Sequence, residues 1–482
     1  MSCELRRKIA KVDPGLPLTR LSPMRVLSFA QSFSAFMVLC SGCSGVRPLV
    51  PPPSDSLACT DDAAIDVLHH DIELSLQLEP PSLVGRGTVR LKLRCPTTRV
   101  ELDARLIVSA VTLDARPLPF RAEDGRLRIE LPQRLQSGAE VSLQMTWEVP
   151  TDGTTPTFFS DQVWAGYHAA AWLPTRQDPA QRATLALRIL APAELKVAAS
   201  GRALVPESIP GARTKHSFVL DRPAPPFLYA FAAGRFAEAS LEVDGFRLRA
   251  LGPAGGDLTQ ALAATAQAYR FLYEKLQTHL PEAVYSQVFV RGDAAQEAAG
   301  IALLGAAFLA DLGADPKEDW VFSHELAHQW FAWLVPCADF ADFWLNEGLA
   351  TFLVAAIKEQ RWGKPAYERE LGLWRERSAK VHRAGRDQPI SLSAPGVPRR
   401  PPPTDALLQP RGVTYARGAL ALHRLRGELG EEIFWNGLRL YVKEHAGRGA
   451  RTEDLRRAME VASGTDLRGF FARWVYAPAP DI

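Results

Sequence analysis

The stretch VFSHELAHQW, Val321–Trp330, decides how the second half of the chain is interpreted. It places His324 and His328 four residues apart, with Glu325 directly after the first histidine. Residues four apart lie on one face of an α-helix, so both imidazoles can reach one ion, and imidazole nitrogen suits zinc. Glu325 is rotated by about 100° from His324 and flanks such an ion, as a base acting on water does.

The flanking residues predict where this helix begins and ends. Asp315 is a good N-cap, Pro316 suits the first helical turn, and Glu318 can reach back to the cap. Pro336 is expected to end the segment. The alternative to a metal site is a pair of helix-face histidines bonded to their neighbours. A catalytic zinc site normally has three protein ligands, so the prediction of a metal site requires one more residue.

The stretch DFWLNEGLATFLVAAI supplies that residue. Glu347 stands nineteen residues after His328 and opens an amphipathic segment. A turn near Pro336–Asp342 followed by an antiparallel helix returns Glu347 to the histidine face. Carboxylate oxygen is an ordinary zinc ligand, so His324, His328 and Glu347 are predicted to hold one zinc ion.

HExxH, eighteen further residues and a glutamate within WLNEGLAT resemble the zinc aminopeptidases of the aminopeptidase N and leukotriene hydrolase family, a group of gluzincin metallopeptidases. The resemblance implies that Glu325 is the general base. It also implies a multidomain α and β fold. An N-terminal antiparallel, saddle-like all-β domain would precede a mostly helical, thermolysin-like zinc peptidase domain.

A second segment, VTYARGALALHRL, is similar to the family's Tyr-x-Lys-Gly-Ala segment. The family's tyrosine donates a hydrogen bond to the oxyanion of the tetrahedral intermediate, and here it corresponds to Tyr415. Arg417 replaces the usual lysine. A neutral phenol suits this role because it donates without adding a cation beside zinc. Packing is the alternative role for Tyr415.

A third segment, AAQEAAGIALLG, resembles the family's Gly-Ala-Met-Glu-Asn segment, whose glutamate holds the α-amine of the substrate. Glu297 and Gly300 fit this pattern as substrate-binding residues, whereas Gln296 and Ala298 replace the methionine and asparagine. The following strand-like GIALLGAAFLA is expected to pair with an extended peptide by edge addition. A surface glutamate is the alternative for Glu297.

Periodicity divides the chain near residue 250. Residues 65–249 alternate apolar and polar residues between Gly and Pro, which predicts an antiparallel β domain. Residues 250–482 carry apolar residues at helical spacing and form the predicted catalytic domain. The Pro-rich Ser393–Pro410 predicts a surface loop. Apolar content of 47% and charged content of 23% are ordinary for a globular protein.

The N-terminus indicates export. Residues 1–43 form a predicted signal segment in which Ser-Gly-Cys resembles a bacterial lipoprotein box, although Cys40 stands where leucine is usual. Cys43 would carry the lipid, residues 44–64 would form a Pro- and Ser-rich tether, and translation would start at Met24. A cleaved, soluble signal peptide is the alternative. A Cys59–Cys95 bridge is compatible with an oxidising compartment, but spacing alone does not establish it.

These features predict an exported bacterial metalloaminopeptidase, anchored to the cell envelope, that removes residues from peptides with a free N-terminus. Net charge is +2, and residues 1–42 account for the excess of basic groups, so nothing indicates a nucleic-acid partner. One alternative is a related zinc hydrolase with endopeptidase or other specificity, which the departures around Glu297 favour. The other is a non-catalytic, lipid-anchored binding module.

Overall fold

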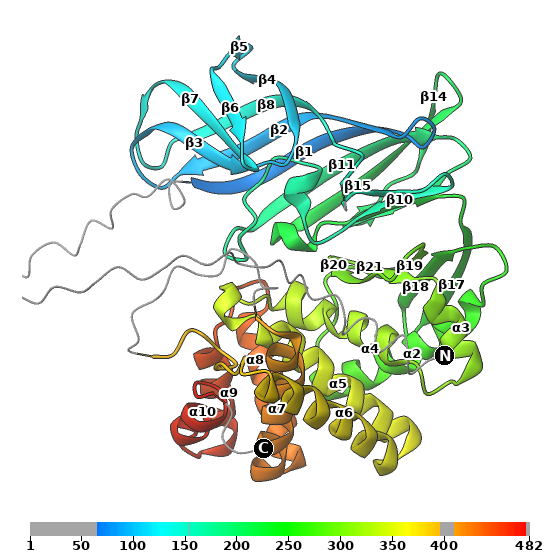
Figure 1. Ribbon diagram of the computed structural model, residues 1–482, viewed down its shortest axis with the longest axis vertical. Coiled ribbons are helices and arrows are strands. Elements are labelled where there is room, and N and C mark those ends of the chain that lie inside the picture. Colours follow the sequence, from blue (N-terminus) through cyan, green and yellow to red (C-terminus); the bar gives the residue numbers. More distant parts are fainter. Residues whose placement is uncertain (1–64, 154, 396–408, 479–482) are drawn as a thin grey trace, which may run out of the picture. The chain divides into compact units, whose positions relative to one another are not determined.

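The computed structural model describes residues 65–153, 155–395 and 409–478, which fall within one compact unit, Asp61–Ile482 (Figure 1). Strands predominate up to residue 252 and helices after it. This order confirms the predicted fold class, while the saddle-like shape stays a prediction. The signal segment, the tether, Cys43 and Cys59 lie outside the described residues, as does most of Ser393–Pro410.

The N-terminal part is built from short and long strands with the alternating burial that the sequence predicted. In chain order they are β1 (Ile65–Gln77), β2 (Ser82–Leu93), β3 (Thr97–Asp103), β4 (Ile107–Leu113), β5 (Arg116–Pro117), β6 (Phe120–Glu123), β7 (Arg126–Leu135), β8 (Glu140–Glu148), β9 (Thr157–Phe158), β10 (Gln162–Ala165), β11 (Ala183–Pro192), β12 (Lys196–Ala199), β13 (Arg202–Ala203), β14 (Glu207–Ile209), β15 (Arg213–Ala224) and β16 (Phe231–Gly234).

Within the described residues these strands form three sheets. The largest has the order β13-β15-β11-β1-β2-β8-β4-β5, with β14 paired to β15; the others are β12-β16-β10-β9 and β3-β7-β6. The expected purely antiparallel arrangement is wrong at one place, because β1 and β11 pair in parallel. These strands are far apart in sequence, so a long connection allows the parallel pairing. Cys95, just after β2, is disulfide-bonded.

A fourth sheet carries the site described below. It consists of β17 (Ala237–Val243), β18 (Phe246–Gly252), β19 (Val284–Val290), β21 (Ile301–Gly305) and β20 (Ala295–Ala298), in that spatial order. The boundary expected at residues 249–250 falls inside β18, which pairs in parallel with β19. β17 and β18 thus pair within this later sheet, and the domain boundary itself stays a prediction.

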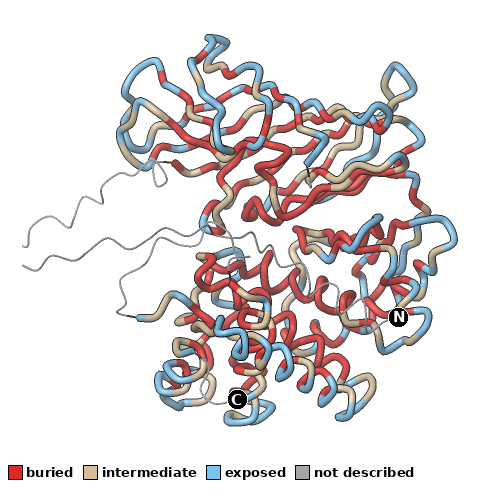
Figure 2. The backbone as a smooth tube through the Cα atoms, viewed as in Figure 1, coloured by how far each residue is buried: buried red, intermediate tan, exposed pale blue. Residues whose placement is uncertain are grey.

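Helices follow this sheet and interleave with its strands. They are α2 (Leu258–Leu276), α3 (Ala307–Ala314), α4 (Trp320–Ala327), α5 (Trp344–Trp362), α6 (Lys364–Arg383), α7 (Gly418–Leu429), α8 (Glu431–His445), α9 (Thr452–Ser463) and α10 (Arg468–Trp474). Phe340–Trp362 is long and apolar enough to cross a membrane, but its most apolar window is entirely buried. It is therefore the core of the helical part, and Figure 2 shows how burial concentrates in such inner segments.

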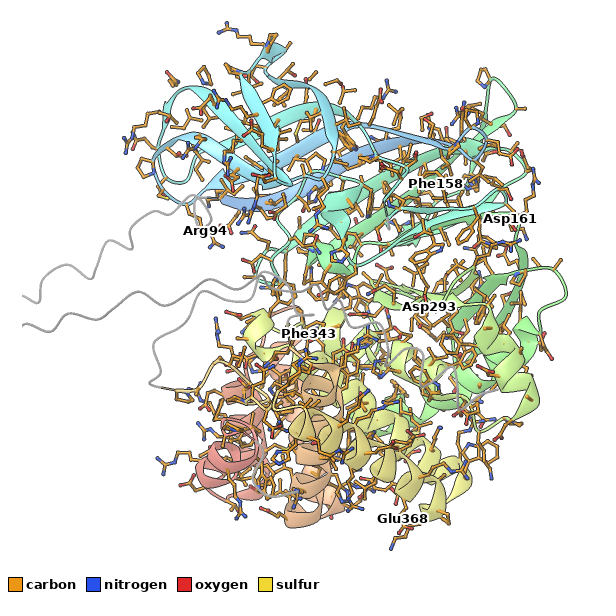
Figure 3. The ribbon with its side chains drawn as sticks, viewed as in Figure 1. Arg94, Phe158, Asp161, Asp293, Phe343 and Glu368 are labelled. Carbon is orange, nitrogen blue, oxygen red and sulfur yellow. The ribbon has the colours of Figure 1, made fainter. Side chains whose placement is uncertain are left out.

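The two parts of the compact unit are joined by polar and aromatic contacts. Asp161, labelled in Figure 3, accepts a hydrogen bond from the Arg291 guanidinium at 2.9 Å. The rings of Phe227 and Phe343 lie 6.3 Å apart, centroid to centroid. The amide of Ala299, in the turn between β20 and β21, donates to the carbonyl of Leu228 at 2.9 Å. The N-terminal part therefore forms a hydrogen bond with the turn directly after β20, the strand that carries Glu297.

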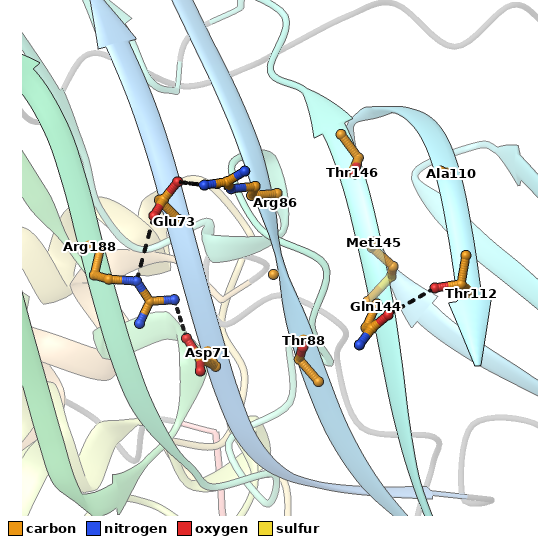
Figure 4. A pocket seen from close by; sticks show the side chains of 11 residues that line it. Asp71, Glu73, Arg86, Thr88, Ala110, Thr112, Gln144, Met145, Thr146 and Arg188 are labelled. Atoms are coloured by element: carbon orange, nitrogen blue, oxygen red, sulfur yellow. Dashed lines mark hydrogen bonds and ion pairs between the residues drawn. The ribbon is translucent and has the colours of Figure 1, made fainter. Parts of the chain in front are cut away.

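A depression of about 420 Å³ lies on the large sheet (Figure 4). Its charged groups are paired with one another: Arg86 donates to Glu73 at 2.8 Å, and Arg188 pairs with Asp71. The residues that line it include neither a histidine nor a cysteine. Arginines thus already neutralise the carboxylates of this depression.

Candidate active site

The histidine-bearing helix begins later than the sequence predicts. Asp315 is the C-cap of α3, and its carboxylate accepts the amide of Lys317 at 2.9 Å in a turn. Helical structure resumes only at Trp320, so Asp315 does not cap α4. The helix also ends before Pro336: Ala327 is its last residue, and a π-helical turn, η4 (Gln329–Leu334), follows.

The face that carries the two histidines is nevertheless preserved. The amide of His328 donates to the carbonyl of His324 at 3.3 Å, so the two residues lie one helical turn apart. Their Nε2 atoms are 3.1 Å apart, and both side chains are buried. The two imidazoles therefore converge on one point.

Glu347 reaches the same point from the first turn of α5. Its buried Oε2 lies 3.3 Å from His324 Nε2 and 3.6 Å from His328 Nε2, and no other side chain of the described residues forms a hydrogen bond with this oxygen. Two ligands about 2.0–2.1 Å from a tetrahedral ion lie about 3.3–3.4 Å from each other. The three separations surround that value, so this donor set fits zinc.

The charges of this cluster depend on one another. Burial opposes ionisation of Glu347, yet the two imidazoles hold its pKa below its usual range. Burial likewise disfavours a charged His328, but the neighbouring carboxylates, Glu347 foremost, raise its pKa to about 10. The site thus stabilises positive charge between the carboxylates. A divalent cation that binds there takes the place of the proton on His328.

The π-helical turn after α4 orients His328. The carbonyl oxygen of Phe331 lies 3.1 Å from His328 Nδ1, which leaves Nε2 facing Glu347. Phe331 has φ −113° and ψ 67°, outside the helical range, and this bend brings its carbonyl back to the ring. Such a bond fixes the tautomer of a metal-binding imidazole. Helical periodicity does not indicate this bend.

Glu325 stands beside the predicted ligands. It is buried, its Oε2 has no partner among the described residues, and it clusters with His328 and Glu297. Burial raises the pKa of Glu325 well above its ordinary value. A carboxyl group that exchanges protons easily is what acid–base catalysis requires.

Tyr415 lies on the other side of His324. It belongs to a second π-helical turn, η7 (Gly412–Arg417), directly before α7. Its ring stacks on that of His324 with centroids 5.9 Å apart and planes 11° apart. Burial raises the pKa of Tyr415 well above its ordinary value, so the phenol stays protonated and can donate. Arg417, which replaces the family's lysine, pairs instead with Asp387 at 2.9 Å. It is therefore not a second hydrogen-bond donor at this position.

Two glycines allow Tyr415 to come close to Glu347. Gly348 and Gly418 face each other where α5 meets α7, and a Cβ on either would lie 3.0 Å from the Cα of the other. Each Cβ would also press on the ring of Trp344. Since backbone atoms cannot move aside cheaply, only glycine permits this helix contact.

Glu297 lies in β20, at the edge of the fourth sheet. It is buried; Gln296 Nε2 donates to its Oε2 at 2.8 Å, while its Oε1 has no partner among the described residues. Burial, reinforced by Glu347 but opposed by His328, raises the pKa of Glu297 to about 7. The structure therefore places an acidic group with one free oxygen beside Glu325.

Gly300 has a structural role in the turn, and its part in substrate binding stays a prediction. It lies in the turn between β20 and β21 with φ +75°, which favours glycine. Its amide donates to Gln329 Oε1 at 3.0 Å, and Gln329 Nε2 donates to the carbonyl of Ala298 at 3.1 Å. The chain therefore turns at Gly300. The two hydrogen bonds of Gln329 connect this turn to the segment that follows α4. No sequence motif pointed to Gln329.

The expectation that GIALLGAAFLA pairs with a peptide is wrong. Its strand, β21, pairs with β19 on one side and β20 on the other. Both of its edges are therefore occupied. The free edge next to the site belongs to β20, which carries Glu297.

Comparison with known proteins supports the same interpretation. Residues 262–474 match the Peptidase family M1 domain. This part of the chain is therefore similar to M1 peptidases. All of the predicted site residues fall within the matched range. The family expected from the motifs is thereby confirmed.

Relatives of this M1 domain include the aminopeptidase N of Streptomyces lividans, 29% identical over 232 residues, which are 45% of this chain and 26% of that protein. The aminopeptidase N of Lactococcus lactis subsp. lactis is 32% identical over 163 residues, 33% of this chain and 18% of its own. The chain thus spans about a quarter or less of these relatives. Both relatives are named as aminopeptidases.

Solved structures extend the likeness in fold to both parts. The M1 zinc metallopeptidase from Deinococcus radiodurans covers 87% of this chain and 95% of its own, with TM-score 0.70 and 23% sequence identity. A mutant of that enzyme bound to a Tyr-Ser-Ala substrate gives TM-score 0.69 over 87% of this chain. The M1 fold therefore includes the N-terminal strands.

The glycine contact gives a prediction about stability. Gly418→Ala should destabilise the protein by about 1–3 kcal/mol, because the added methyl meets backbone, and should lower kcat by displacing Tyr415. Gly427→Ala in the same helix is the matched control. A Cβ there meets nothing, so stability should hold or rise by up to about 1 kcal/mol. Urea unfolding of both variants measures the difference, and equal effects would contradict the close contact.

Proposed function

We propose that this protein is a zinc-dependent aminopeptidase that removes N-terminal residues from peptides. The observation that carries the proposal is the convergence of His324, His328 and Glu347 on one buried point. Zinc held there would supply Lewis acidity, which polarises the scissile carbonyl and makes a nearby water molecule acidic.

The side chains around this point divide the remaining work. Glu325 takes the proton of the attacking water and later gives it to the leaving amine, which suits a buried carboxyl with a free oxygen. Tyr415 donates its phenolic hydrogen to the oxyanion that develops on the carbonyl oxygen. Both side chains stand next to the predicted ligands, which favours an enzyme over a non-catalytic binding module.

Glu297 supports removal of single N-terminal residues. Its free oxygen is buried beside the centre, where an α-ammonium group would form a charge-assisted hydrogen bond with it. An ammonium held there limits how much of the peptide lies before the scissile bond. The alternative is an endopeptidase. Such an enzyme does not bind a free α-amine, so a buried anion at this position would have no role in it.

Loss of the base is the direct test of the mechanism. Glu325→Gln should keep zinc but lower kcat by about 10²–10⁴, because the amide cannot accept the proton of water. We would measure hydrolysis of alanyl-coumarin together with zinc content. Wild-type protein treated with a zinc chelator serves as the control and should also lose turnover. Normal turnover in Glu325→Gln would end the proposed mechanism.

Specificity for a free N-terminus is tested at Glu297. Glu297→Gln keeps the size of the side chain but removes its charge, so KM for a peptide with a free amine should rise about 10- to 100-fold. Binding of free and N-acetylated peptides, measured by calorimetry in the Glu325→Gln background, gives the comparison. A loss of affinity that is the same for both peptides would show that Glu297 does not bind the amine.

We also propose export and attachment to the bacterial cell envelope through a lipid on Cys43. The disulfide bond of Cys95 supports an oxidising compartment. Cells that express the protein should incorporate labelled palmitate into it, and Cys43→Ser should abolish both the label and recovery in the membrane fraction. Equal fractionation of the two proteins would favour a cleaved, soluble form.

A further inference from the structure

Arg411 lies at the rim of the candidate active site. It immediately precedes the turn η7, its side chain is exposed, and its guanidinium carbon is 5.8 Å from the centroid of the Tyr415 ring. Tyr415 in turn stacks on His324. Arg411, Tyr415 and His324 thus form a column that runs from solvent to the predicted metal ligands.

The arrangement follows from the local sequence. Arg411 and Tyr415 are four residues apart around a helical turn, so their side chains share a face. Stacking on an aromatic face holds a guanidinium in place while its N–H groups stay available at the edges. Across residues 65–153, 155–395 and 409–478, no carboxylate forms an ion pair with Arg411.

The interior of the site is rich in carboxylates. Glu297 and Glu325 cluster with His328, one of the predicted ligands. These carboxylates and Glu347 would repel any anionic group of a substrate. A cation at the rim is the feature that allows such a group to approach.

We propose that Arg411 binds a carboxylate of the substrate and so sets a preference for acidic or very short peptides. The inference rests on the proposed peptidase function. A guanidinium matches the planar carboxylate and can bind it through two parallel hydrogen bonds. That carboxylate is either an acidic side chain near the scissile bond or the C-terminal carboxylate of a di- or tripeptide.

Two substrate pairs separate these sources. Glutamyl- and glutaminyl-coumarin differ in the charge of the side chain, and Ala-Ala-Ala and its C-terminal amide differ in the terminal carboxylate. For each pair we divide kcat/KM of the charged substrate by kcat/KM of the neutral one. In Arg411→Ala this ratio should fall about 10-fold or more in one pair, chiefly because KM of the charged substrate rises. Arg411→Lys should retain part of the ratio, because it keeps the charge but loses the fork of donors.

A control variant tests whether the effect is specific to Arg411. Arg134→Ala removes an exposed guanidinium from β7 in the N-terminal part and should leave both ratios unchanged. Calorimetry in the Glu325→Gln background measures the same pairs without turnover. A fall confined to one pair identifies the carboxylate, and unchanged ratios in both pairs would overturn the proposal. Wild-type protein that hydrolyses none of the four substrates would instead contradict the proposed function itself.

Discussion

Burial of Glu347 is the constraint on which the rest of this structure depends. A carboxylate enclosed by apolar residues costs several kcal/mol unless charged or polar partners compensate it. Nearly the whole of α5 is buried, from Trp344 to Lys358, so bulk solvent hydrates the Glu347 carboxylate little. Compensation comes from His324 and His328, and it requires α4 and α5 to be held in one relative position.

Several polar contacts fix that position. Asp342, just before α5, accepts hydrogen bonds from the hydroxyl groups of Ser391 and Thr452, at 2.7 and 2.6 Å. Thr452 also accepts from Trp344 Nε1 at 2.8 Å, in the first turn of α5. On the other side, Gln329 connects α4 to the edge of the fourth sheet. The start of α5 and the end of α4 are therefore both fastened by side chains outside the predicted site.

The sequence predicts those parts of the site that depend on local spacing. His324 and His328 share a face because they lie one helical turn apart. Glu347 lies beside them because the chain reverses direction between α4 and α5. Contacts between distant segments were not predictable. Neither periodicity nor composition indicates that Gly348 meets Gly418. The same limit explains the strand errors: the apolar run of β21 is consistent with its complete burial but does not tell which neighbouring strands complete its hydrogen bonds.

Charge balance is the physical reason for the proposed preference for a peptide amine. The carboxylates of Glu297, Glu325 and Glu347 lie close together in a buried space, and like charges at short range in low dielectric repel strongly. A divalent cation offsets two of these charges, and an α-ammonium at Glu297 offsets the third. A peptide bound through its interior brings no ammonium to Glu297, so that carboxyl must stay protonated or unpaired. The proposed binding of a free N-terminus would therefore leave the site electrically neutral, and binding of a peptide through its interior would not.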